Sequence, residues 1–156
     1  MDLLSLMVLC SPLVDPATTL RVIDVESGGH PYAIHDNTEG RSYDGANSAQ
    51  AVSLASALIR AGHRVDLGLM QINYEVWLRP TGFSLEKAFD ACTNVRLGTT
   101  ILSANYAKVL RRSVSGLDAL QRALSVYNSG SESRSWEYAH NVLSGRTSIR
   151  LLGRDF

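Results

Sequence analysis

The feature that most constrains the fold of this chain is a long amphipathic segment between Asn94 and about Arg112. Apolar residues recur there at spacings of three and four, which is the period of an α-helix. Other elements must cover the apolar side of such a helix. Signals for strands are few elsewhere, so we expect a mainly α fold with at most a minor β-hairpin. The stripe consists of Val95, Leu97, Ile101, Leu102, Tyr106, Val109 and Leu110.

Start and stop signals for helices divide the rest of the chain. Asp15 can cap a helix and Pro16 suits its first position, so residues 16–27 are predicted to be helical, with an end at Gly28 and Gly29. Residues 30–47 are predicted to be a loop, with a short hairpin across 37–40 as the alternative. Residues 66–73 are predicted to form a turn into a short helix through Trp77 and Leu78. Further helices are expected at 48–62, 85–90, 117–127 and 136–144.

Composition excludes several classes of protein. The chain has 156 residues, enough for one domain, and its 15 basic residues balance its 15 acidic residues. No overall positive charge favours a nucleic-acid partner. No apolar run approaches the roughly 20 residues that span a bilayer, so no membrane span is expected. The four histidines, His30, His35, His63 and His140, show no metal-binding spacing, so neither a metal nor another cofactor is expected.

The first 16 residues are apolar, but they lack a positively charged start and a small-residue cleavage site. They are predicted to form an opening helix of the domain. A short or trimmed export signal is the alternative, so the export route stays open.

The chain has two cysteines, Cys10 and Cys92, without the close spacing of a zinc site. Two interpretations remain open from the residues alone. The cysteines are either buried free thiols in a cytosolic protein or one disulfide in an oxidising compartment.

Glu26 stands at the end of an apolar helical segment and is followed at once by Ser27, Gly28 and Gly29. On a helix it shares a face with Val22 and Ile23, which indicates an inward position. Burial and the helix C-terminus both disfavour a carboxylate, so the pKa of Glu26 should be raised. A carboxyl group that is protonated near neutral pH can act as a general acid. The alternative is a structural ion pair with an arginine such as Arg21.

Four motifs in order resemble the soluble lytic transglycosylase family, which has the fold of goose-type lysozyme. GluSerGlyGlyHisProTyrAla at 26–33 is similar to the family's catalytic Glu-Ser segment. GlyLeuMetGlnIleAsn at 68–73 is similar to its Gly-Leu-Met-Gln motif, and AsnValArgLeuGly at 94–98 to its Asn-x-x-x-Gly helix opening. AlaLeuSerValTyrAsnSerGly at 123–130 is similar to its Tyr-Asn-x-Gly motif. The resemblance implies one lysozyme-like domain over 1–156, with a motif core at 10–130 and a C-terminal helix and tail at 131–156.

The closest branch is that of the small transglycosylases of type IV secretion and conjugation systems. The segments 10–20, 33–37 and 88–98 resemble that branch, including a cysteine before the Asn-x-x-x-Gly helix. Both cysteines stand where the branch has its pair, so the resemblance implies a Cys10–Cys92 disulfide. It also implies a periplasmic protein, with peptidoglycan strands and secretion or conjugation subunits as partners.

The family's chemistry is non-hydrolytic cleavage of the bond between N-acetylmuramic acid and N-acetylglucosamine. By motif position, Glu26 would be the single catalytic acid and base. Ser27 would help to hold Glu26 near the sugar, and Met70 and Gln71 would line the cleft beside acetamido groups. Tyr127 would reach Glu26 or the reacting sugar, and Asn128 would bind substrate.

Two rival functions share this fold. A hydrolytic muramidase would need a second acid near the cleft, for which Asp36, Asp44 and Asp66 are candidates. A peptidoglycan-binding or assembly module of the secretion machine would need no catalytic acid. The rival is disfavoured by an intact set of motif residues, namely Glu26, Gln71, Tyr127 and Asn128.

Overall fold

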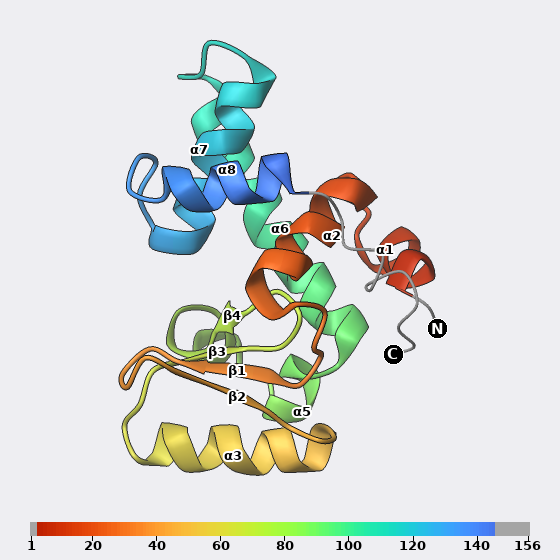
Figure 1. Cartoon of the computed structure of the whole chain (residues 1–156), viewed down its shortest axis with the longest axis vertical. Coiled ribbons are helices and arrows are strands. Elements are labelled where there is room, and N and C mark those ends of the chain that lie inside the picture. Colours follow the sequence, from red (N-terminus) through yellow and green to blue (C-terminus); the bar gives the residue numbers. More distant parts are fainter. Residues whose placement is uncertain (1–2, 146–156) are drawn as a thin grey trace.

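The computed structural model describes residues 3–145 and confirms a mainly helical protein. Figure 1 shows helices above and around a small sheet, with α3 running beneath the sheet in that view. The elements in chain order are α1 (Leu3–Cys10), α2 (Pro16–Ser27), β1 (Ala33–Asp36), β2 (Arg41–Asp44), α3 (Ser48–Arg60), β3 (Val65–Leu67), β4 (Ile72–Asn73), the π-helical turn η1 (Tyr74–Leu78), α4 (Arg79–Thr81), α5 (Leu85–Ala88), α6 (Ala91–Leu110), α7 (Gly116–Ser129) and α8 (Trp136–Ser144).

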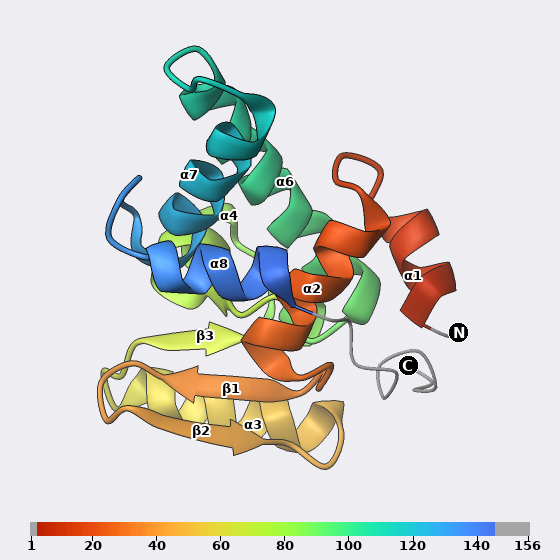
Figure 2. The same cartoon turned by 45° about the horizontal axis from the view of Figure 1, so that its top comes forward.

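The amphipathic segment forms α6, which runs through the middle of the molecule against α1, α5 and α7 (Figure 2). Val95, Leu102 and Val109 on its apolar side are buried. The predicted start at Asn94 was three residues late, because Asp90 caps the helix by accepting a hydrogen bond from the backbone N–H of Thr93 at 2.8 Å.

The caps predicted for the second helix are confirmed. The side chain of Asp15 accepts a hydrogen bond from the N–H of Thr18 at 3.1 Å, and Pro16 occupies the first turn. Gly28 ends α2 in the left-handed conformation with φ 58°. Glu26 therefore lies in the last turn of α2, two positions before Gly28.

The sheet is larger than the single hairpin expected. The hairpin across 37–40 is confirmed as β1 and β2, and β1 also pairs antiparallel with β3, which pairs with β4. The predicted turn is present at 68–71, and the predicted short helix is present as η1, which ends at Leu78. The prediction missed the strands on either side of the turn, β3 and β4. Strands of three and two residues are too short to show a period of two, and β1, the partner of β3, is remote in sequence.

A disulfide joins Cys10 at the end of α1 to Cys92 in the first turn of α6. This confirms the pairing that the family resemblance implied. Leu6, Met7 and Cys10 are buried, so α1 is part of the core. Within residues 3–145, no helix combines the length and the apolar character that crossing a membrane requires.

Candidate active site

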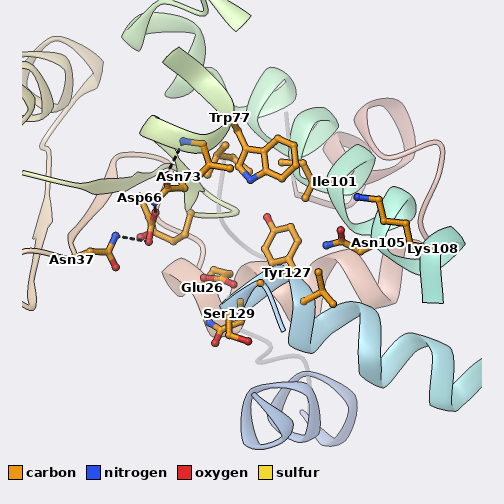
Figure 3. Close-up of a pocket in the computed structure, with 16 residues that line it drawn as sticks. Glu26, Asn37, Asp66, Asn73, Trp77, Ile101, Asn105, Lys108, Tyr127 and Ser129 are labelled. Carbon is orange, nitrogen blue, oxygen red and sulfur yellow. Dashed lines mark hydrogen bonds between the residues drawn. The ribbon is translucent and has the colours of Figure 1, made fainter. Parts of the chain in front are cut away.

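Glu26 lies in an open cleft between the sheet and helices α6 and α7 (Figure 3). The cleft consists of two adjoining pockets, of about 480 Å³ and about 540 Å³, that share Glu26, Asn37, Asp66, Gln71 and Asn128. Amide and carboxyl groups dominate this shared part, which suits a neutral, polar ligand such as a sugar.

The carboxyl group of Glu26 is half-buried, and its Oε1 accepts a hydrogen bond from the hydroxyl of Tyr138 at 2.5 Å. Removal from water raises the pKa of Glu26 from 4.5 to about 7, although the Tyr138 hydrogen bond opposes the increase. The negative charge of Asp66 adds to the increase. The raised pKa that the sequence predicted is therefore confirmed, and Glu26 can hold or release a proton near neutral pH.

Tyr138 is the site residue that the sequence analysis missed. It lies on α8, which packs against α2, and it reaches Glu26 from 112 positions along the chain. The helix at 136–144 was predicted, and a tyrosine on its apolar side beside Ala139 and Val142 was the available signal. Arg21 does not pair with Glu26, because its Nη1 donates to the carbonyl of Leu143 at 3.2 Å.

The family motifs hold the segment Leu69–Gln71 by its backbone. Ser27 Oγ donates to the carbonyl of Leu69 at 2.8 Å, and the hydroxyl of Tyr127 donates to the carbonyl of Met70 at 2.8 Å. The hydrogen bond to Glu26 comes from Tyr138 and not from Tyr127, while Tyr127 lines the same pocket as Glu26, so its contact with the reacting sugar stays a prediction. Ser27 lines the cleft beside Glu26, but its hydroxyl donates to the backbone carbonyls of Ile23 and Leu69 and so supports the loop rather than the carboxyl group.

The prediction that Met70 lines the cleft was wrong. Its side chain is fully buried, so it does not line the cleft. It packs against Gly98 of α6, where a Cβ atom would lie 2.5 Å from the sulfur of Met70. The glycine of the Asn-x-x-x-Gly motif therefore gives Met70 its space.

Asn94, the first residue of that motif, is buried and uses its whole side chain to hold the same segment. Its Oδ1 accepts from the N–H of Met70 at 2.8 Å, and its Nδ2 donates to the carbonyls of Leu67 and Ala88 at 2.9 and 2.8 Å. Gly68 makes this approach possible, because a Cβ there would lie 2.3 Å from Asn94 Nδ2. Asn94 was predicted only as a motif position, and its role is to support the loop.

Gln71 follows this anchored segment and lines both pockets. Its backbone has φ 47°, a left-handed value that a non-glycine residue adopts at an energetic cost. Its Nε2 donates to the carbonyls of Gly68 at 2.8 Å and Ala33 at 3.2 Å, which leaves Oε1 as an acceptor for a ligand. Asn128, exposed near the end of α7, lines the same two pockets.

The three candidate second acids differ in position. Asp66 lines both pockets with Glu26 and accepts hydrogen bonds from Asn37 and Asn73 at 2.8 and 2.7 Å. Burial raises the pKa of Asp66. Asp44 lies at the edge of the second pocket only. Asp36 is fully buried outside the cleft, where it binds His63 at 2.7 Å and the backbone of the β1–β2 turn.

Among residues 3–145, no group of three or more His, Cys, Asp and Glu side chains has the arrangement of a metal site. The polar groups that line the cleft are mainly carboxyl and amide groups, with the phenol of Tyr127.

Comparison with known proteins adds to this geometry. The model of the family described as "Transglycosylase SLT domain" matches residues 6–146. The chain is 33% identical over 136 residues to "Protein virB1" of Agrobacterium fabrum, covering 87% of this chain and 52% of that protein. It is 31% identical over 122 residues to "Type IV secretion system protein virB1" of Brucella abortus, covering 78% of this chain and 51% of that protein. The chain thus spans about half the length of these relatives. No solved structure matches it.

Proposed function

Because this chain belongs to the transglycosylase SLT domain family, we propose that it is a peptidoglycan lytic transglycosylase. The substrate is the β-1,4 bond between N-acetylmuramic acid and N-acetylglucosamine. The single observation that carries the proposal is Glu26, a carboxyl group with a pKa raised to about 7 in an open, amide-lined cleft.

In the proposed reaction, protonated Glu26 donates its proton to the glycosidic oxygen as the bond from that oxygen to C1 of the muramic acid breaks. The C6 hydroxyl of the same sugar then attacks C1 and forms the 1,6-anhydro ring. The carboxylate of Glu26 accepts the proton of this hydroxyl and returns to its starting state. One carboxyl group serves both steps, and no water molecule is consumed.

The surroundings of Glu26 suit both steps. A pKa near the working pH makes a group effective as an acid and, after proton loss, as a base. Tyr138 donates to Glu26 Oε1 and so holds the carboxyl group in one orientation. The second oxygen, Oε2, accepts no hydrogen bond from residues 3–145 and is available to the substrate.

We assign substrate contacts to Gln71 and Asn128, which line both pockets together with Glu26. The free Oε1 of Gln71 would accept a hydrogen bond from an acetamido N–H or a sugar hydroxyl. Ser27 acts on the sugar only through its place beside Glu26 and its bond to Leu69, so it is a positioning residue.

The cellular role that we propose is local opening of the cell wall for a type IV secretion or conjugation apparatus. A relative named as a type IV secretion system protein supports this role. The disulfide supports an oxidising compartment, which in this setting is the periplasm. Subunits of the apparatus would then be partners. The role predicts that the wild-type gene, but not Glu26→Gln, restores transfer to a cell that lacks the chain.

Mass spectrometry of the products tests the reaction itself. Purified peptidoglycan treated with the protein should release fragments that end in 1,6-anhydromuramic acid, and Glu26→Gln should release none. Fragments that are one water heavier would refute the transglycosylase and favour the hydrolase, with Asp66 as the acid that shares the cleft. The absence of any fragment would favour the binding module.

A further inference from the structure

The cleft has a second part that the reaction above does not use. On the side of α6 it is formed by Trp77 from η1 and by Ile101, Asn105 and Lys108 from α6, and we call these four residues the α6 arm (Figure 3). Asn105 and Lys108 lie one turn apart and share a face of the helix. The arm lies across Tyr127 from the carboxyl groups of Asp66 and Glu26.

Asn105 is the first sign that the arm binds a ligand. Its residue surface is 4% exposed, and its side chain makes no hydrogen bond to another residue of 3–145. Its amide atoms are not cut off from solvent, because within residues 3–145 the buried side-chain nitrogen or oxygen without a partner is the Nε of Arg21. The amide lines the cleft, so a ligand can supply the missing partners.

Lys108 is the second sign. It is exposed, and among the described residues that line the 480 Å³ pocket it is the one Lys or Arg. It forms no ion pair within the described part of the chain, although Arg112, just past the end of α6, is paired with Glu132. The acidic groups of the cleft, Glu26 and Asp66, lie on the other side of Tyr127. The arm is therefore a positively charged end of an otherwise neutral or acidic cleft.

Trp77 completes the arm. Its side chain is 39% exposed and lines the cleft above Ile101. An exposed indole offers a flat apolar surface on which a sugar ring or a peptide plane can lie. The indole of Trp77, the amide of Asn105 and the ammonium group of Lys108 together match a ligand that has amide groups and a negative charge.

We propose that the α6 arm binds the peptide stem of a muramyl residue through a carboxylate of that stem. Asn105 pairs with an amide of the stem or of the attached acetamido group, and Lys108 pairs with the carboxylate. The inference rests on the proposed function, because it takes peptidoglycan as the substrate. It adds that the protein distinguishes stems that carry free carboxylates from stems whose carboxylates are amidated.

Two synthetic ligands test this inference: a tetrasaccharide of peptidoglycan with carboxylate-bearing stems, and the same tetrasaccharide with every stem carboxylate amidated. Calorimetry gives the dissociation constant of each for the full chain carrying Glu26→Gln. Adding Lys108→Met should weaken binding of the carboxylate ligand about fivefold, and it should change binding of the amidated ligand less than about twofold. High salt should weaken only the Lys108-dependent binding.

Two further variants separate local contacts from general effects. Arg60→Met removes an equal charge from an exposed position on α3, outside the cleft, and should leave both affinities unchanged. Asn105→Leu should weaken both ligands, because both contain amides, and it should not lower the melting temperature, because the amide makes no hydrogen bond within residues 3–145 that the variant would lose.

The inference is overturned if Lys108→Met weakens both ligands equally or neither, or if Asn105→Leu lowers the melting temperature. A stripped glycan that retains only lactyl carboxylates and binds with the same Lys108 dependence would also overturn it, since the charge would then belong to the sugar. Carboxylate-dependent binding without anhydro products would support the α6 arm and refute the proposed reaction. Anhydro products together with binding that does not depend on Lys108 would support the proposed reaction and refute the role of the α6 arm.

Discussion

The replacement Glu26→Gln should stabilise the fold, and only at neutral and alkaline pH. In the folded protein the pKa of Glu26 is raised from 4.5 to about 7. At low pH both the folded and the unfolded chain hold the proton, so ionisation adds no penalty. Between pH 4.5 and 7 the unfolded chain releases the proton first, and the free energy of unfolding falls. Above pH 7 the loss is complete.

The size of the effect follows from the shift. Each unit of pKa corresponds to about 1.4 kcal/mol, so a change from 4.5 to about 7 gives about 3 kcal/mol at pH 8. Because Glu26 is half-buried, this is an upper value. For a domain of this size, it corresponds to an increase in melting temperature of roughly 6–12 °C. Glutamine carries no charge at any of these pH values, and its carbonyl can still accept the bond from Tyr138.

Thermal unfolding followed by circular dichroism at pH 4 and pH 8 measures the difference. The variant should match the wild type at pH 4 and melt higher at pH 8, while its activity is lost at both. Glu39→Gln, at an exposed position in the β1–β2 turn, is the control and should show no such dependence. Equal differences at both pH values would refute the reasoning, because Glu26 would then not hold its proton more tightly in the fold.

Three other changes test the site and its support. Tyr138→Phe removes a hydrogen bond that lowers the pKa of Glu26, so the pH at which kcat/KM falls should move upward; an unmoved pH profile would contradict the contact. Replacing Cys10 and Cys92 by serine should lower the free energy of unfolding by about 2–4 kcal/mol in denaturant titrations, whereas equal midpoints would mean that the bond adds nothing. Asn94→Leu removes the side-chain hydrogen bonds to three backbone groups, so the free energy of unfolding should fall by about 2–4 kcal/mol in denaturant titrations. A smaller fall than that caused by replacing an exposed asparagine would argue against the support role.

Helices with strong local signals could be predicted from the sequence. The boundaries of α2 and α8 agree with the predicted ranges 16–27 and 136–144. Capping bonds such as that of Asp15 join residues three positions apart, so a short window of sequence contains both partners. Burial of Glu26 could be inferred for the same reason, since its helical face is defined by Val22 and Ile23.

The short strands could not be predicted in the same way. β1 offers backbone partners to β3, with Ile34 opposite Leu67 across a long stretch of chain, and β3 in turn pairs with β4. The direction of Met70 was also out of reach. Its motif named the residue, but only the packing against Gly98 shows that the side chain points into the core.

The sequence by itself determined which chemistry this chain carries, because the carboxyl group, its burial and the order of the motifs are properties of short segments. The tertiary structure decided which groups meet. Tyr138 on α8 reaches Glu26 on α2, and Tyr127 on α7 donates to Met70, through the packing of these helices. These contacts join residues far apart in the chain, and side-chain packing in three dimensions has no short-range pattern from which they could be read.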